Sequence, residues 1–256
     1  MVKAFSGQYI VKAVRNNPDI IKYVFDPIGN EMGFKQNNPN HIYDIYEHSI
    51  KTVENVVEIL NQDNKVNGQK IDGALTLAAL LHDIGKPQTA EIGQDGYLHF
   101  SRHAVVGKDI ASKLLHRLKY YNSEIKEICQ LIKYHDIFVV YKKTCKRILA
   151  DIGEEQFKKL LILREADILA QSKFNRDSKL ANIVNMRVWL NEILAENAAL
   201  KIKDLKVNGT DLIGLGIKPG RQIGEILNKL LDLVIDEDIE NNRDILLNYV
   251  KEQYIK

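Results

Sequence analysis

A run of nine mostly apolar residues that ends in two polar ones constrains this chain most. Residues 73–81 read GALTLAALL and are apolar on nearly every side, which is typical of a buried helix rather than an amphipathic one. His82 and Asp83 follow directly. An imidazole and a carboxylate in an apolar environment destabilise a fold unless something compensates them. A metal ion would compensate both groups together, whereas a buried ion pair or a capping interaction is the alternative.

Four other residues could complete such a metal site: His48, His103, His135 and Asp167. His48 lies on the flank of the apolar stripe of a predicted helix, and Asp167 lies among apolar neighbours. Together with His82 and Asp83, they form a nitrogen and oxygen set that suits manganese, iron, cobalt, nickel or zinc. His103 and His135 could hold a second ion, with the Asp83 carboxylate bridging the two. Ions about 3.5–4 Å apart are typical of phosphoryl-transfer sites.

Each candidate also has a purely structural interpretation. A histidine beside an apolar face is commonly a hydrogen-bonded core or surface residue, and on that ground we assign no metal to His41, His99 or His116. His135 and Asp136 could instead mark a helix end followed by a turn. Asp167 could pair with Arg164 on the neighbouring turn.

Three- and four-residue spacing of apolar residues dominates the chain and predicts an all-α fold. Residues 61–70 are predicted to be a loop, and residues 89–100 offer room for no more than a small hairpin. Ser101 is a plausible N-cap of the helix that follows. Helices are predicted over 41–60, 73–81, 123–134, 144–151, 154–172 and 179–200, and over a segment around 223–234. We expect a helical lead-in over 1–40, a metal-binding helical domain over 41–200 and a helical tail over 201–256.

Composition restricts the function classes. The 256 residues carry a net charge of +2, which is too mild by itself to indicate nucleic-acid binding. No apolar run is long enough to cross a membrane, and residues 1–8 lack the apolar core of a signal peptide. Cys129 and Cys145 are therefore expected to be reduced thiols in a cytoplasmic protein.

Several segments resemble one known family in their order and in their amino-acid sequence. They are GFKQNNPNHIYDIYEHS at 33–49, LHDIGKP at 81–87, HFSRH at 99–103 and LKVNGTDLIGLGIKPG at 205–220. The order His48, His82–Asp83, Asp167 resembles the HD superfamily of metal-dependent phosphohydrolases. The amino-acid sequence of these segments resembles the HD domain and tail of bacterial CCA-adding tRNA nucleotidyltransferases, from about residue 25 onward. Arg102 is a departure, because relatives usually have glycine before the histidine.

The resemblance implies an HD-domain helical bundle with a smaller C-terminal helical tail. It implies one or two divalent ions (Mn, Ni, Co, Fe, Zn or Mg) at the site already described, with His103 and His135 as the extra histidines of two-metal members. Asp83 and Lys86 would be catalytic, with Lys86 neutralising phosphate charge. The implied substrates are nucleotide or RNA-end phosphoesters, hydrolysed as 2′,3′-cyclic phosphates, 2′-nucleotides or phosphomonoesters.

Residues 1–40 lack the glycine pair and acidic pair of a nucleotidyltransferase head, so we expect no nucleotide addition by this chain alone. The main alternative to an enzyme is a non-catalytic module that binds tRNA or another RNA. Lys218 and Arg221 would then contact phosphate, together with backbone amides exposed if Pro219 begins a helix. The same segment could be a glycine-rich turn with a solvated basic rim. A third hypothesis is a partner subunit of a separately encoded nucleotidyltransferase.

Overall fold

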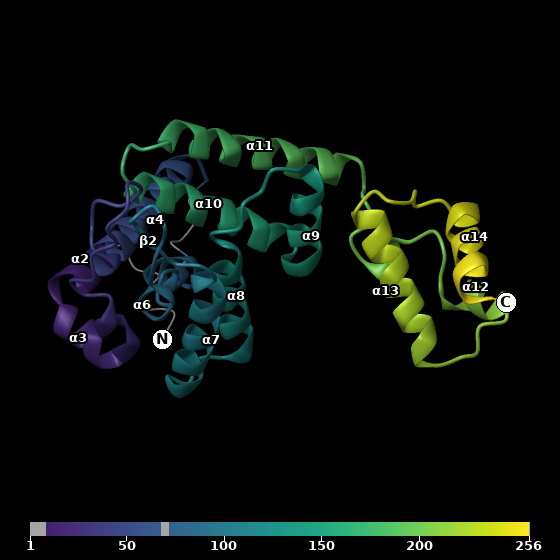
Figure 1. The fold of residues 1–256 in the computed structure, drawn as a ribbon, viewed down its shortest axis with the longest axis horizontal. Coiled ribbons are helices and arrows are strands. Elements are labelled where there is room, and N and C mark those ends of the chain that lie inside the picture. Colours follow the sequence, from purple (N-terminus) through teal and green to yellow (C-terminus); the bar gives the residue numbers. More distant parts are fainter. Residues whose placement is uncertain (1–8, 68–71, 256) are drawn as a thin grey trace. The chain divides into compact units, whose positions relative to one another are not determined.

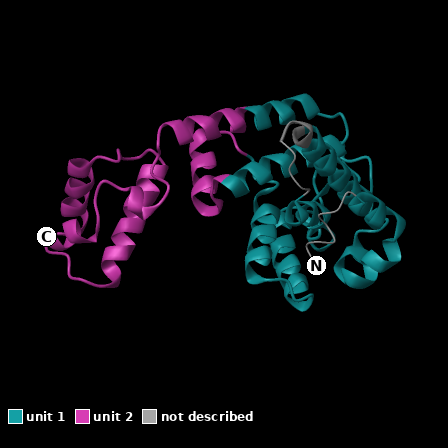
Figure 2. Cartoon of the chain, turned by 180° about the vertical axis from the view of Figure 1, so that it is seen from behind, with its two compact units in different colours: residues 1–138, 155–184 teal, residues 139–154, 185–256 magenta. Residues whose placement is uncertain are grey.

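The computed structural model describes residues 9–67 and 72–255, and their side chains except those of 63–67. Nearly all regular structure in this part of the chain is helical, which confirms the all-α prediction (Figure 1). The chain forms two compact units (Figure 2). Unit 1 comprises residues 1–138 and 155–184, and unit 2 comprises residues 139–154 and 185–256. The expected divisions near residues 40 and 200 stay predictions.

Unit 1 is built around helix α5, Gly73–Leu81, in which every residue is buried. Asp72 begins this helix by accepting hydrogen bonds from the amides of Ala74 and Leu75. Helices α4 and α8 pack against α5, so the predicted buried helix is confirmed. The elements of unit 1 are α2 (Ile10–Asn16), α3 (Pro18–Val24), the 3₁₀ helix η1 (Asp26–Asn30), α4 (Ile45–Asn67), α5, α6 (Lys86–Thr89), β1 (Glu91–Ile92), β2 (Leu98–His99), α7 (His103–Arg117), α8 (Asn122–Tyr134), α10 (Glu154–Ala170) and the start of α11 (Arg176–Ala195).

Strands β1 and β2 form a small hairpin between residues 89 and 100, which is the most that the sequence allowed there. They are antiparallel, with Glu91 opposite His99 and Ile92 opposite Leu98. The hairpin leads directly into the turn before α7.

Three local predictions were wrong. Helix α4 continues to Asn67, so residues 61–67 are helical; this stretch contains neither glycine nor proline to stop the helix, and residues 68–70 lie outside the described part. Ser101 is not the N-cap of α7, because the helix begins at His103 and Ser101 lies inside a turn that the hydrogen bond from the His103 amide to the Phe100 carbonyl closes. Helix α13 begins at Arg221, after Gly220 at φ +146°, which excludes Pro219 from it.

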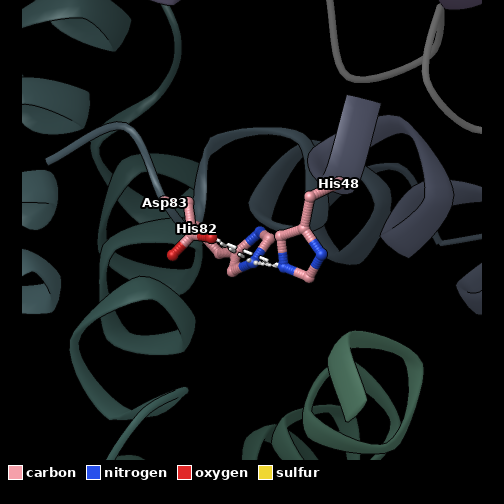
Figure 3. A group of neighbouring side chains, drawn as sticks. All are labelled: His48, His82 and Asp83. Carbon is pink, nitrogen blue, oxygen red and sulfur yellow. Dashed lines mark hydrogen bonds and ion pairs between the residues drawn. The ribbon is translucent and has the colours of Figure 1, made fainter. Parts of the chain in front are cut away.

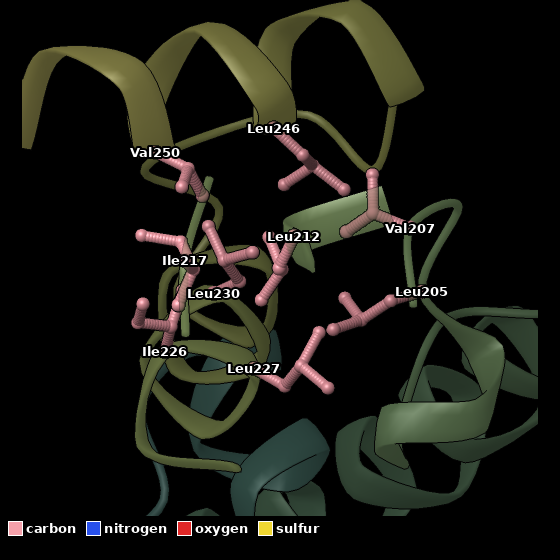
Figure 4. Packing of buried hydrophobic residues seen from close by; sticks show 9 residues of the cluster. All are labelled: Leu205, Val207, Leu212, Ile217, Ile226, Leu227, Leu230, Leu246 and Val250. Atoms are coloured by element: carbon pink, nitrogen blue, oxygen red, sulfur yellow. The ribbon is translucent and has the colours of Figure 1, made fainter. Parts of the chain in front are cut away.

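Unit 2 has its own apolar core, drawn in Figure 4. Helices α12, α13 and α14 and the segments that connect to them supply it, and Asn208 and Asn242 cap α12 and α14. The unit contains α9 (Lys142–Ile152), the end of α11, the 3₁₀ helix η2 (Ile202–Asp204), α12 (Gly209–Gly214), α13 (Arg221–Ile235) and α14 (Arg243–Tyr254). The core consists of Leu205, Val207, Leu212, Ile217, Ile226, Leu227, Leu230, Leu246 and Val250.

None of the helices in the described residues is both long and apolar enough to cross a lipid bilayer. Cys129 and Cys145 are both buried and form no disulfide with each other. Burial raises the pKa of the Cys129 thiol to about 11, so it stays protonated and unreactive.

Candidate metal centre

Helices α4, α5 and α10 bring the first group of predicted ligands together. His48 lies in the first turn of α4, and His82 and Asp83 follow the last residue of α5 (Figure 3). The Nε2 atoms of His48 and His82 are 3.3 Å apart. Asp83 Oδ2 lies 3.5 Å from His48 Nε2 and 3.3 Å from His82 Nε2. Asp167, on α10, places Oδ1 2.9 Å from His48 Nε2 and 3.8 Å from His82 Nε2. The predicted set therefore meets at one point.

Helices α7 and α8 bring a second group to the other oxygen of Asp83. His103 is the first residue of α7, and His135 follows the last residue of α8. Their Nε2 atoms are 3.1 Å apart, and Asp83 Oδ1 lies 3.3 Å from His103 Nε2 and 3.6 Å from His135 Nε2. All three side chains are buried. Asp83 thus faces one pair of histidines with each carboxylate oxygen.

The spacing of these atoms fits metal coordination. Donors about 2.0–2.2 Å from one ion, at angles near 90–110°, are about 3–3.5 Å from one another. The donor atoms of each three-residue group, His48–His82–Asp83 and Asp83–His103–His135, lie within 4.8 Å of one another. Each group could therefore hold a divalent ion.

The orientation of the histidines supports the same interpretation. The Nδ1 atoms of His82, His103 and His135 lie 2.7–2.8 Å from the carbonyl oxygens of Ala79, Phe100 and Ile132, so each Nδ1–H donates to a carbonyl. In a neutral ring, Nε2 then carries the lone pair that a metal needs. The Nε2 lone pairs of these histidines point toward the carboxylate oxygens. Because hydrogen-bond acceptors that face one another repel, a cation between them would stabilise this arrangement.

The pKa values show how strongly the site keeps its carboxylates charged. Burial alone would raise the pKa of Asp83, but the charges of His82 and Lys86 outweigh it and hold that pKa well below its usual value. Burial opposes ionisation of Asp167 too, and the hydrogen bond from His48 lowers its pKa. Burial alone would lower the pKa of His82, yet the nearby carboxylates raise it. The site therefore attracts cations, whether protons or metal ions.

Lys86 lies beside this centre and is already engaged. The residue is 5% exposed, and Nζ lies 2.7 Å from Asp83 Oδ2 while donating to Gln36 Oε1 at 2.8 Å. The lysine thus neutralises Asp83 in the structure. Its predicted contact with substrate phosphate stays a prediction.

Sequence reasoning missed several neighbours of the ligands. The His41 ring lies edge-on to His48, with centroids 5.0 Å apart, and burial together with Lys86 lowers its pKa to about 2, so it is neutral. Gln171 donates to Asp167 Oδ1 at 3.0 Å. The position of Gln171 one helical turn after Asp167 is a signal that could have identified this contact.

Glu31 is a further missed residue. Its carboxylate is completely buried, and burial raises the pKa of Glu31 well above its usual value. Nothing in the local sequence around Glu31 distinguishes it from a surface residue.

A cavity of about 560 Å³ adjoins the centre in unit 1. Asp83, His103, His135 and Asp167 are part of its lining. Among all its lining residues, the aspartates Asp83, Asp95, Asp136 and Asp167 outnumber the two cations, Lys86 and Arg102. A phosphate group would meet net negative charge there unless cations occupied the centre.

Lys218 and Arg221 belong to unit 2, whereas the predicted ligands belong to unit 1. Both are exposed, and Arg221 Nε is 2.8 Å from Glu225 Oε1 one helical turn away. Gly216 and Gly220 have φ values of +95° and +146°, so this segment is a glycine-dependent turn.

Residues 94–250 match the family described as "tRNA nucleotidyltransferase domain 2 putative". The chain therefore belongs to the tRNA nucleotidyltransferase domain 2 family.

Curated relatives extend this match. The chain is 26% identical to an A-adding tRNA nucleotidyltransferase of Deinococcus radiodurans over 78% of this chain and 44% of that protein. It is 27% identical to a CC-adding tRNA nucleotidyltransferase of Thermus thermophilus over 61% of this chain and 35% of that protein. A CCA-adding enzyme of Ligilactobacillus salivarius is 44% identical over 50 residues, which are 19% of this chain and 12% of that enzyme. The chain spans less than half the length of these relatives.

Proposed function

We propose that this chain is an HD-type, metal-dependent phosphohydrolase that acts on nucleotide or RNA-end phosphoesters. The observation that carries the proposal is the sharing of Asp83 between two three-residue groups of metal-ligand type. His48, His82 and Asp167 would hold one ion with Asp83, and His103 and His135 would hold the second. Kinship with tRNA nucleotidyltransferases favours the 3′ end of tRNA, or a related RNA end, as substrate.

The side chains of the centre suit hydrolysis of a phosphoester. Hydrolysis forms a bond between phosphorus and a water oxygen and breaks a bond to a ribose oxygen, which leaves with a proton. When bound, divalent ions make water more acidic and neutralise phosphate charge. Asp83 would orient both positions through its two oxygens, while Lys86 keeps the charge of this carboxylate balanced. The carbonyl contacts of the histidines fix their rings for this task.

The test is turnover by the purified protein with manganese, nickel or magnesium. Substrates are 2′,3′-cyclic nucleotides, 2′-nucleotides and a generic phosphomonoester. We expect hydrolysis that requires metal, is abolished by Asp83→Ala and is retained by His116→Ala, because His116 is an exposed histidine that bonds only locally. An absence of metal-dependent turnover on every substrate would refute the proposal.

A non-catalytic RNA-binding role is the second candidate, favoured by the exposed cations of the tail turn. Lys218 and Arg221 would contact phosphate in this role. We expect salt-dependent binding of tRNA that weakens in a Lys218→Ala/Arg221→Ala variant. Unchanged tRNA binding in this variant would show that Lys218 and Arg221 do not contribute to it.

A further inference from the structure

The cavity beside the metal centre contains one cation that the centre does not use. Of the two basic residues in its lining, Lys86 is buried against Asp83, whereas Arg102 is exposed. No carboxylate of the described residues forms an ion pair with Arg102. Its guanidinium is therefore available to a ligand that enters the cavity.

The backbone at Arg102 is held in a conformation that favours glycine. Its φ is +64° and its ψ is 15°, in the left-handed region. Its carbonyl accepts hydrogen bonds from the amides of Val105 and Val106, which fixes this conformation at the start of α7. Glycine adopts this region more readily than arginine does, so an arginine at this position has a local conformational cost. The ligand candidate His103 is the next residue in the chain.

Of the tyrosine and phenylalanine side chains that line the same cavity, two are exposed. Tyr97, in the β-hairpin, is 45% exposed, and Phe174, between α10 and α11, is 52% exposed. Exposed aromatic faces offer stacking surfaces for nucleic-acid bases. The cavity thus combines a place for a reacting phosphate, a free guanidinium and surfaces for a base.

We propose that Arg102 is a specificity-determining residue that binds a second phosphate of the substrate. A guanidinium matches phosphate geometry with two parallel hydrogen bonds. The preferred substrate is then an oligonucleotide end, with its terminal phosphoester at the metal centre, its neighbouring phosphodiester on Arg102 and a base against Tyr97 or Phe174. The inference rests on the proposed function, because it names the substrate class of the same site.

The experiment compares a mononucleoside 2′,3′-cyclic phosphate with a dinucleotide that ends in the same group, using manganese-loaded protein. The readout is the ratio of the two kcat/KM values. We expect Arg102→Gly to lower the preference for the dinucleotide about tenfold, as loss of a charged hydrogen bond would. Arg102→Lys should retain part of the preference.

Lys119→Gly is a matched control. Lys119 is also exposed with φ +60°, lies just beyond the other end of α7 and is absent from the cavity lining. Both glycine variants remove one cation and relieve one positive φ, so we expect neither to lower the melting temperature. An unchanged substrate ratio in Arg102→Gly, or an equal change in Lys119→Gly, overturns the inference.

If the wild-type protein hydrolyses neither of these cyclic phosphates, binding decides the inference, and the proposed function is judged by the full substrate set given above. The probe is a dinucleotide with a 3′-phosphate, titrated in the presence of manganese. An affinity about tenfold weaker in Arg102→Gly than in Lys119→Gly supports the role of Arg102. Equal affinities overturn it.

Discussion

Replacing Gly85 by alanine tests how closely helix α7 is held against the candidate metal centre. A Cβ atom at Gly85 would lie 2.2 Å from the His103 carbonyl oxygen and 2.6 Å from the Gly107 amide nitrogen. Both are backbone atoms, so α7 itself must shift to relieve the contacts. The backbone at Gly85, with φ −85° and ψ −14°, suits alanine, and steric overlap is therefore the whole effect.

Overpacking of this kind destabilises by about 3 kcal/mol. Gly107→Ala is the matched control, because its Cβ would be 3.3 Å from the Gly85 amide nitrogen and 3.5 Å from Ile84 Cγ2. We expect that variant to stay within about 1 kcal/mol of the parent, since the gain in helix propensity offsets mild crowding. Urea denaturation measures both variants. Equal midpoints for Gly85→Ala and Gly107→Ala would show that the contact between Gly85 and α7 does not hold the centre together.

Three further predictions concern other parts of the chain. Gly224→Ala should stabilise unit 2 by about 1 kcal/mol in thermal denaturation, because its Cβ would meet nothing within 4 Å inside α13; no gain would contradict this. Leu246→Ala should destabilise unit 2 by about 3 kcal/mol, because this side chain is fully buried in the apolar core of that unit. An unaltered denaturation curve would show that Leu246 does not pack there. Burial raises the pKa of Glu31 in the folded state, so the Glu31 carboxyl group destabilises the fold increasingly as pH rises above 4.5. Glu31→Gln should therefore stabilise the protein more at pH 8 than at pH 5. An equal change in stability at both pH values would contradict this prediction.

The sequence predicted the parts of the fold that depend on apolar patterning. The run 73–81 had to be a buried helix, and its end placed His82 and Asp83 in the interior. The order of polar residues in apolar surroundings also identified the other histidines and Asp167 that the structure gathers around Asp83. Their role as metal ligands stays a prediction.

Other features depend on tertiary contacts that no local pattern records. The burial of Glu31 and the position of His41 beside His48 arise from the packing of the segment before α4 against the centre. Arg102 adopts its left-handed conformation because the hairpin and α7 determine the turn between them. The extension of α4 was missed because polar residues can continue a helix beyond its apolar stripe.

The metal content of the purified protein and its variants tests the central claim most directly. We predict two divalent metal ions per chain in the wild type and in His116→Ala, and about one in His82→Ala and in His103→Ala. Asp83→Ala should lose most of both, because each group of ligands includes this carboxylate. Metal content that is the same in all five proteins would contradict the account.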